Sequence, residues 1–112
     1  MKFAGASRVM VIRYREKKIK TFAELKNTIT TMDLDCGIRI LGNITGFAHG
    51  GFIFITKMGE QYTVNMTERV LFKDGKTLVP GGRENWFYTD DSEKTWLIIK
   101  DKLMRPFEAW IY

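Results

Sequence analysis

The stretch that decides the fold is residues 37–66, which read GIRILGNITGFAHGGFIFITKMGEQYTVNM. Apolar residues recur there at every second position, as with Ile38, Ile40 and Ile44. This two-residue period is typical of strands, in which successive side chains point to opposite faces. The glycines of FAHGG and MGE interrupt the pattern and predict turns. Continued to Val79, the region predicts four or five short antiparallel strands, which usually curl into a small barrel or a strongly twisted sheet.

Two turn signals follow this region. Asp74-Gly75, within KDGK, is a strong signal for a two-residue hairpin turn between apolar strands. Pro80-Gly81-Gly82 is the clearest break in the chain, because proline cannot donate a backbone hydrogen bond and glycine weakens a strand.

The N-terminal part predicts one strand and one helix. Apolar residues alternate with charge over residues 7–17, which indicates a strand. Thr21 precedes a helical apolar stripe, with Glu24 at the spacing of a capping box. We therefore expect a short helix of about three turns after Thr21.

The C-terminal part of the sequence allows two interpretations of one segment. A second helix is predicted near residues 92–104, capped by Asp91 or Ser92, and a strand through Trp96–Ile99 is the alternative. Residues 107–112 alternate and predict a closing strand.

These elements predict an α+β fold: a single domain over residues 1–112 with an N-terminal strand–helix unit and mostly antiparallel sheet. Residues 37–79 form either a twisted sheet or a small barrel that resembles the SH3 or OB architectures. That resemblance concerns architecture alone and implies no function.

The composition excludes several kinds of site. Among 112 residues there is one histidine, His49, and one cysteine, Cys36, too few for a structural zinc site. His49 lies in a glycine-rich stretch and is expected to serve a turn. We predict no enzyme, no metal and no cofactor; a metal-dependent nuclease using Asp90, Asp91 and Glu93 is the minor alternative.

Charge is concentrated in RYREKKIK, residues 13–20, where five of eight residues are basic and one is acidic. On a strand, Arg13, Arg15 and Lys17 project from one face, about 6.6 to 6.8 Å apart. Lys18 and Lys20 continue the charge. Such a row suits the repeating phosphates of a nucleic acid. The alternative is a solvated edge strand, whose cations prevent unwanted pairing. Arg83 is a further candidate cation.

Aromatic residues form the second candidate group. Trp86, Phe87 and Tyr88 are adjacent, so on a strand they cannot all point into the core. We expect Trp86, Tyr88 and Trp110 to be available for base stacking or for a protein interface. Most of the other aromatic residues are assigned to the core, namely Phe22, Phe52, Phe54, Tyr62 and Phe72.

The net charge of +5 and the pI near 9.4 favour an acidic partner. We therefore predict a non-enzymatic binding protein that engages nucleic acid or a nucleoprotein complex. The alternative is a small accessory or inhibitor protein, of the phage or mobile-element type, that docks on an acidic host protein. A homodimer face around Trp86 is a third reading. We expect no signal peptide and no membrane contact, which predicts a cytoplasmic protein.

Overall fold

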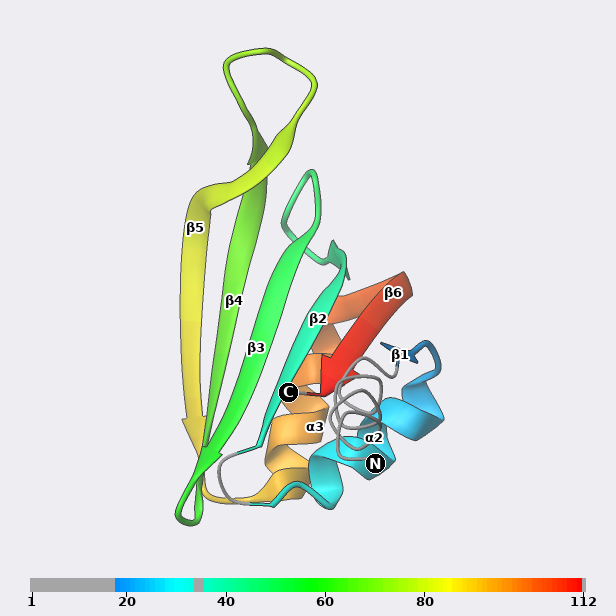
Figure 1. Cartoon of the computed structure of the whole chain (residues 1–112). Helices are drawn as coiled ribbons and strands as arrows, with labels where there is room; N and C mark the ends of the chain where they lie inside the picture. The colour runs from blue at the N-terminus through cyan, green and yellow to red at the C-terminus, as the bar shows by residue number, and fades with distance from the viewer. Residues whose placement is uncertain (1–17, 34–35, 112) are drawn as a thin grey trace, which may run out of the picture.

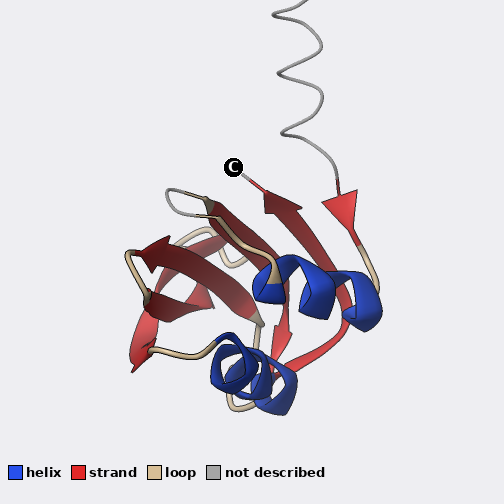
Figure 2. Cartoon of the chain, turned by 90° about the horizontal axis from the view of Figure 1, so that it is seen from below, coloured by secondary structure: helices blue, strands red, loops and turns tan. Residues whose placement is uncertain are grey.

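The computed structural model describes residues 18–33 and 36–111. Six strands form one antiparallel sheet in the order β1-β6-β2-β3-β4-β5, and both helices lie on one side of it, inside its curve (Figures 1 and 2). The elements in chain order are β1 (Lys18–Ile19), α2 (Phe22–Thr30), β2 (Gly37–Ile44), β3 (Gly51–Met58), β4 (Gln61–Leu71), β5 (Leu78–Thr89), α3 (Ser92–Lys102) and β6 (Leu103–Ile111). The predicted α+β class with mostly antiparallel strands is confirmed.

The core lies between the sheet and the helices. Strand residues with the predicted two-residue period supply one wall, and they include Ile38, Ile40, Ile53, Ile55 and Val64, all fully buried. The helices supply the other wall through Leu25, Ile29, Trp96 and Ile99. The alternation read from the sequence therefore selects the inner face of the sheet.

Both helices begin where capping chemistry predicts. Thr21 Oγ1 accepts a hydrogen bond from the Glu24 backbone N–H at 3.2 Å, as in a capping box. Asp91 caps α3 by accepting from the Glu93 backbone N–H at 2.9 Å. The segment Trp96–Ile99 lies inside α3, so the alternative of a strand there is wrong.

The sheet does not close into a barrel. The last strand, β6, pairs with β2 and β1, so it lies at the opposite end of the sheet from β5. β5 pairs with β4 on one side and, within the described chain, has no partner strand on its other side. The SH3- or OB-like barrel alternative is therefore wrong, and the twisted-sheet alternative is confirmed.

The predicted break at Pro80-Gly81-Gly82 is wrong, because β5 runs through it. The pairing of β4 with β5 shifts in register between Thr67 and Arg69, and β5 bends near this point (Figure 1). Proline is tolerated because β5 is an edge strand, and glycine often marks a bulge. The hairpin at Asp74-Gly75 is confirmed, but its connection spans residues 72–77 rather than two residues.

Two glycines allow the middle strands to pack tightly. A Cβ atom on Gly42 of β2 would lie 2.6 Å from the Phe107 Cβ of β6. A Cβ atom on Gly51 of β3 would lie 2.3 Å from the Thr67 carbonyl oxygen of β4. Gly42 and Gly51 are directly paired across β2 and β3.

Candidate functional site

The sheet face that points away from the helices carries one row of side chains that crosses all six strands. The row follows directly paired residues, which share a face in an antiparallel sheet. Its members, in strand order, are Lys18, Trp110, Arg39, Phe54, Asn65 and Trp86. We call this row and the two rows beside it the open face.

The neighbouring rows extend the same surface. On one side of the central row lie Glu108, Leu41, Phe52, Thr67 and Glu84, and on the other lie Thr56, Thr63 and Tyr88. Phe52 and Phe54 are half-buried there, and Phe72 is exposed at the β4–β5 turn. The prediction that these three phenylalanines belong to the core is wrong. Ile53 and Ile55 occupy the inward positions of β3, and Phe72 lies beyond the end of β4, in the connection to β5.

Two pairs of aromatic rings stack on the open face. The Phe52 and Phe54 ring centroids lie 6.2 Å apart on β3, with planes 22° apart. Trp86 and Tyr88 lie 6.4 Å apart on β5, with planes 10° apart. Trp86 is 53% exposed and Tyr88 62%, so both rings offer flat apolar area to solvent. Phe87, between them, packs against the core, as the adjacency of three aromatics predicts.

Each of the two ring pairs forms a flat stacking surface, which we call a station, and a third station lies on β6 and β2. The Arg39 guanidinium lies over the Trp110 ring, 5.0 Å from its centroid. A guanidinium held on an indole is a cation–π pair and keeps its N–H donors available at its edge. This station therefore joins an aromatic surface to a positive charge.

Asn65 separates the phenylalanine pair from the Trp86–Tyr88 pair. Its Nδ2 donates to Glu84 Oε1 at 2.8 Å, and its Oδ1 accepts from Thr67 Oγ1 at 2.7 Å. Both bonds fix the orientation of the amide, which is only 7% exposed. The network gives the centre of the open face a rigid polar patch between apolar rings.

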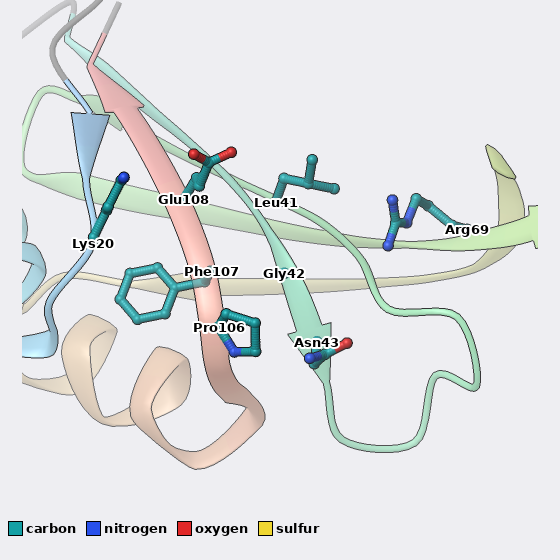
Figure 3. Close-up of a pocket in the computed structure, with 8 residues that line it drawn as sticks. All are labelled: Lys20, Leu41, Gly42, Asn43, Arg69, Pro106, Phe107 and Glu108. Carbon is teal, nitrogen blue, oxygen red and sulfur yellow. The ribbon is translucent and has the colours of Figure 1, made fainter.

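A shallow hollow of about 470 Å³ lies at one end of the open face, beside Leu41 and Glu108 (Figure 3). Lys20 and Arg69 line it from opposite sides, and Asn43 adds an amide. Nearby, Lys18 Nζ forms an ion pair with Glu108 Oε2 at 3.2 Å. β1 and the residue after it therefore bring two lysines to this end of the face, and β6 adds the carboxylate of Glu108.

Arg83 does not join the row. Its guanidinium contacts Glu68 Oε2 at 3.3 Å, donates to the Gly46 carbonyl oxygen and lies 5.4 Å from the Phe47 ring centroid. The hydrogen bond from the Arg83 side chain lowers the pKa of Glu68, and the same bond raises the pKa of Arg83. These contacts tie the bulge of β5 to the β2–β3 turn and give Arg83 a structural role, while its predicted binding role stays a prediction.

The structure thus brings together four predicted site residues, Lys18, Trp86, Tyr88 and Trp110, on one face, with Lys20 beside it. Arg13, Arg15 and Lys17, with the predicted strand over residues 7–17, lie outside the described residues. Sequence reasoning missed Arg39, Phe52, Phe54 and Asn65. For Phe52 and Phe54 the signal was GFIFIT itself, because a strand that is apolar at consecutive positions must present apolar side chains on both faces. Arg39 and Asn65 had no such local signal.

Three residues with reactive or ionisable side chains lie as follows. Asp91 caps α3, and His49 lies in the β2–β3 turn, where its carbonyl oxygen accepts from Arg69 Nε at 3.0 Å. Cys36 is half-buried against the core. No group of three or more His, Cys, Asp or Glu residues that could hold a metal ion occurs in residues 18–33 and 36–111.

Neither of the two described helices has the length and apolar character needed to cross a membrane. Comparison with protein-family models, with curated proteins and with solved structures returned no match to this chain.

Proposed function

We propose that the chain binds single-stranded nucleic acid on the open face without catalysing a reaction. The observation that carries this proposal is the continuous row of Trp110, Arg39, Phe54, Asn65 and Trp86 on the uncovered side of the sheet. Aromatic side chains on a sheet are a recurrent platform for unpaired bases, because every base has a flat face to stack.

The spacing of the three flat stations supports an extended strand as ligand. Trp110 on β6, Phe54 on β3 and Trp86 on β5 are each separated by two strand positions. Neighbouring strands lie about 4.7 to 4.9 Å apart, so successive stations stand about 9 to 10 Å apart. An unpaired chain of three or more nucleotides can span them, whereas a duplex keeps its bases stacked on each other and cannot offer their faces.

Three cations are available to contact a phosphate backbone beside stacked bases. Lys18, Lys20 and Arg39 belong to the open face and its edge. With three phosphate contacts, the logarithm of affinity falls with the logarithm of salt concentration with a slope of about −2 for a single strand. The affinity then drops roughly 20-fold between 50 and 200 mM salt. If Arg13, Arg15 and Lys17 also contact phosphates, the slope is about −4.

The test is a fluorescence-anisotropy titration of labelled single-stranded DNA and RNA oligonucleotides and their duplexes at both salt concentrations. We expect preference for single strands, and a loss of about 5- to 150-fold for Trp86→Ala or Trp110→Ala, from the usual worth of one stacked base. Leu97→Ala is the matched control, because Leu97 is 59% exposed on α3, on the helical side. The triple variant Arg13→Ala, Arg15→Ala, Lys17→Ala reports whether the slope falls from about −4 to about −2.

A protein partner is the second candidate, and β5 favours it. Over twelve residues this strand has no neighbour on its outer side within the described sheet, and it carries exposed Trp86 and Tyr88. An exposed edge accepts a strand from another chain, and Trp, Tyr and Arg concentrate at interfaces. An accessory or inhibitor role on an acidic host protein, or a homodimer through β5, gains support if no oligonucleotide binds at 50 mM salt. Light scattering on the purified chain then separates the homodimer from the heterologous complex.

A further inference from the structure

A second hollow lies on the helical side of the sheet, where α2, α3 and the first residues of β6 meet. Its volume is about 560 Å³, within the range of about 300 to 1,000 Å³ that is usual for small-molecule sites. It shares no lining residue with the open face, so it is independent of the proposed function.

The inner wall of this hollow is apolar. Trp96 and Leu103 form part of it and are only 6% and 3% exposed, so they are fixed by the core. The Phe22 ring stands edge-on to Trp96 with centroids 6.1 Å apart. Met104, 47% exposed, adds a flexible apolar side chain at the mouth. This wall offers aromatic and aliphatic contact area to a ligand.

The charged residues that the described chain brings to the rim are all cationic. Lys26 of α2, Lys100 of α3 and Arg105 of β6 come from three different elements, and no acidic residue of the described part lines the hollow. Among residues 18–33 and 36–111, none of these three cations has a carboxylate within ion-pair distance. The Arg105 guanidinium instead lies 5.4 Å from the Phe22 ring centroid.

Two other hollows in the described part of the chain differ in this respect. The hollow of Figure 3 includes Glu108, and the third includes Glu60, Asp90 and Asp91. The combination of an apolar wall with an exclusively cationic rim therefore distinguishes the hollow between the helices.

We propose that the hollow between α2 and α3 binds a small organic anion, with an apolar body against Phe22 and Trp96 and one carboxylate between Lys26, Lys100 and Arg105. Burial of the apolar body supplies the affinity, and the cations fix the orientation and select the charge. A neutral molecule with the same apolar body gains only the free energy of apolar burial.

Octanoate is a suitable probe, and 1-octanol is its neutral counterpart of equal chain length. Isothermal titration calorimetry on the full chain measures both. We expect octanoate to bind the tighter of the two. The double variant Lys26→Gln, Lys100→Gln should weaken octanoate roughly 2- to 30-fold, the effect of two exposed ion pairs, and leave octanol unchanged.

Two further variants complete the test. Lys94→Gln removes the same charge from α3 at a position outside the hollow, so it should leave octanoate affinity unchanged. Ala23→Trp adds bulk at an exposed lining position without changing charge, and it should abolish binding of both probes while circular dichroism shows the native fold. The proposal is overturned if octanoate binds no tighter than octanol, if Lys94→Gln weakens it as much as the double variant, or if Ala23→Trp still binds.

Discussion

Two neighbouring residues of β3 test whether one face of the sheet serves binding and the other serves stability. Phe54 stands in the central row of the open face, and Ile53 points into the core. We expect Phe54→Thr to reduce nucleic-acid binding with little loss of stability, and Ile53→Ala to reduce stability with little loss of binding. Threonine keeps the β-branched shape that strands favour, so the change at position 54 removes the ring without disturbing the strand.

The magnitudes follow from burial. Ile53 has no exposed surface, and truncation of such a residue to alanine costs about 2 to 5 kcal/mol through lost transfer energy and the cavity left behind. For a chain of 112 residues, each kcal/mol corresponds to roughly 4 °C in Tm, so the expected shift is about 8 to 20 °C. Phe54 is half-buried and its pairs are cross-strand contacts, worth about 0.2 to 1 kcal/mol each, so its loss should cost about 1 kcal/mol.

The two variants need two assays run on the same samples. Urea unfolding followed by circular dichroism gives the free energy of unfolding, and anisotropy with a labelled single strand gives the affinity at a temperature where both variants are folded. Phe54→Thr should lose about 5- to 150-fold in affinity, the value of one stacked base. The reasoning is refuted if Phe54→Thr lowers stability by as much as Ile53→Ala, or if its affinity equals that of the wild type.

Three further predictions concern stability. Glu68→Gln should lower the urea midpoint at neutral pH but match the wild type in strong acid. The hydrogen bond from Arg83 holds the pKa of Glu68 below its ordinary 4.5. The stabilisation from Arg83 is therefore present above pH 4.5 and is lost as the pH falls through the folded-state pKa. Midpoints measured from pH 3 to 7 check this, and a pH-independent difference would contradict it. Gly51→Ala should lower the free energy of unfolding in urea by about 1 to 3 kcal/mol, because its Cβ would meet the Thr67 carbonyl oxygen. An unchanged free energy of unfolding would mean that β3 and β4 can move apart locally without cost. Thr95→Val should cost about 1 kcal/mol by the same measurement, because the buried hydroxyl donates to the Asp91 carbonyl oxygen at 3.0 Å and is hydrogen-bonded with Thr89 Oγ1 at 2.6 Å; equal midpoints would show that the two bonds together contribute nothing.

The elements with local signals could be predicted from the sequence. Thr21 with Glu24 and Asp91 with Glu93 marked the two helix starts, since capping depends on residues within one turn. The inward positions of β2 followed from alternation alone, whereas β3 is apolar at consecutive positions and its inward face did not.

What could not be predicted depends on pairing between distant segments. The placement of β6 between β1 and β2 is a non-local choice that no turn signal reveals, and it is this placement that aligns Trp110 with Arg39. The continuation of β5 through Pro80 depends on its being an edge strand, which also requires knowledge of the strand order. The sequence therefore indicated individual site residues, but only the strand order shows that they lie on one face.

Gly51, in the middle of the sheet, has a consequence for the register of β3. Because GFIFIT is apolar on both faces, a slip of one residue would bury Phe52 and Phe54 and expose the isoleucines at little cost in hydrophobic area. Burial alone cannot distinguish these two arrangements. Gly51 opposes one of the two possible slips, because moving Phe52 into its place would put a side chain against the Thr67 carbonyl oxygen, where a Cβ atom has no room. The slip in the other direction would place Gly50 there, so Gly51 does not oppose it. Gly51 thus contributes steric selection to the choice of which side chains of β3 face solvent, in addition to its part in the close packing of β3 and β4.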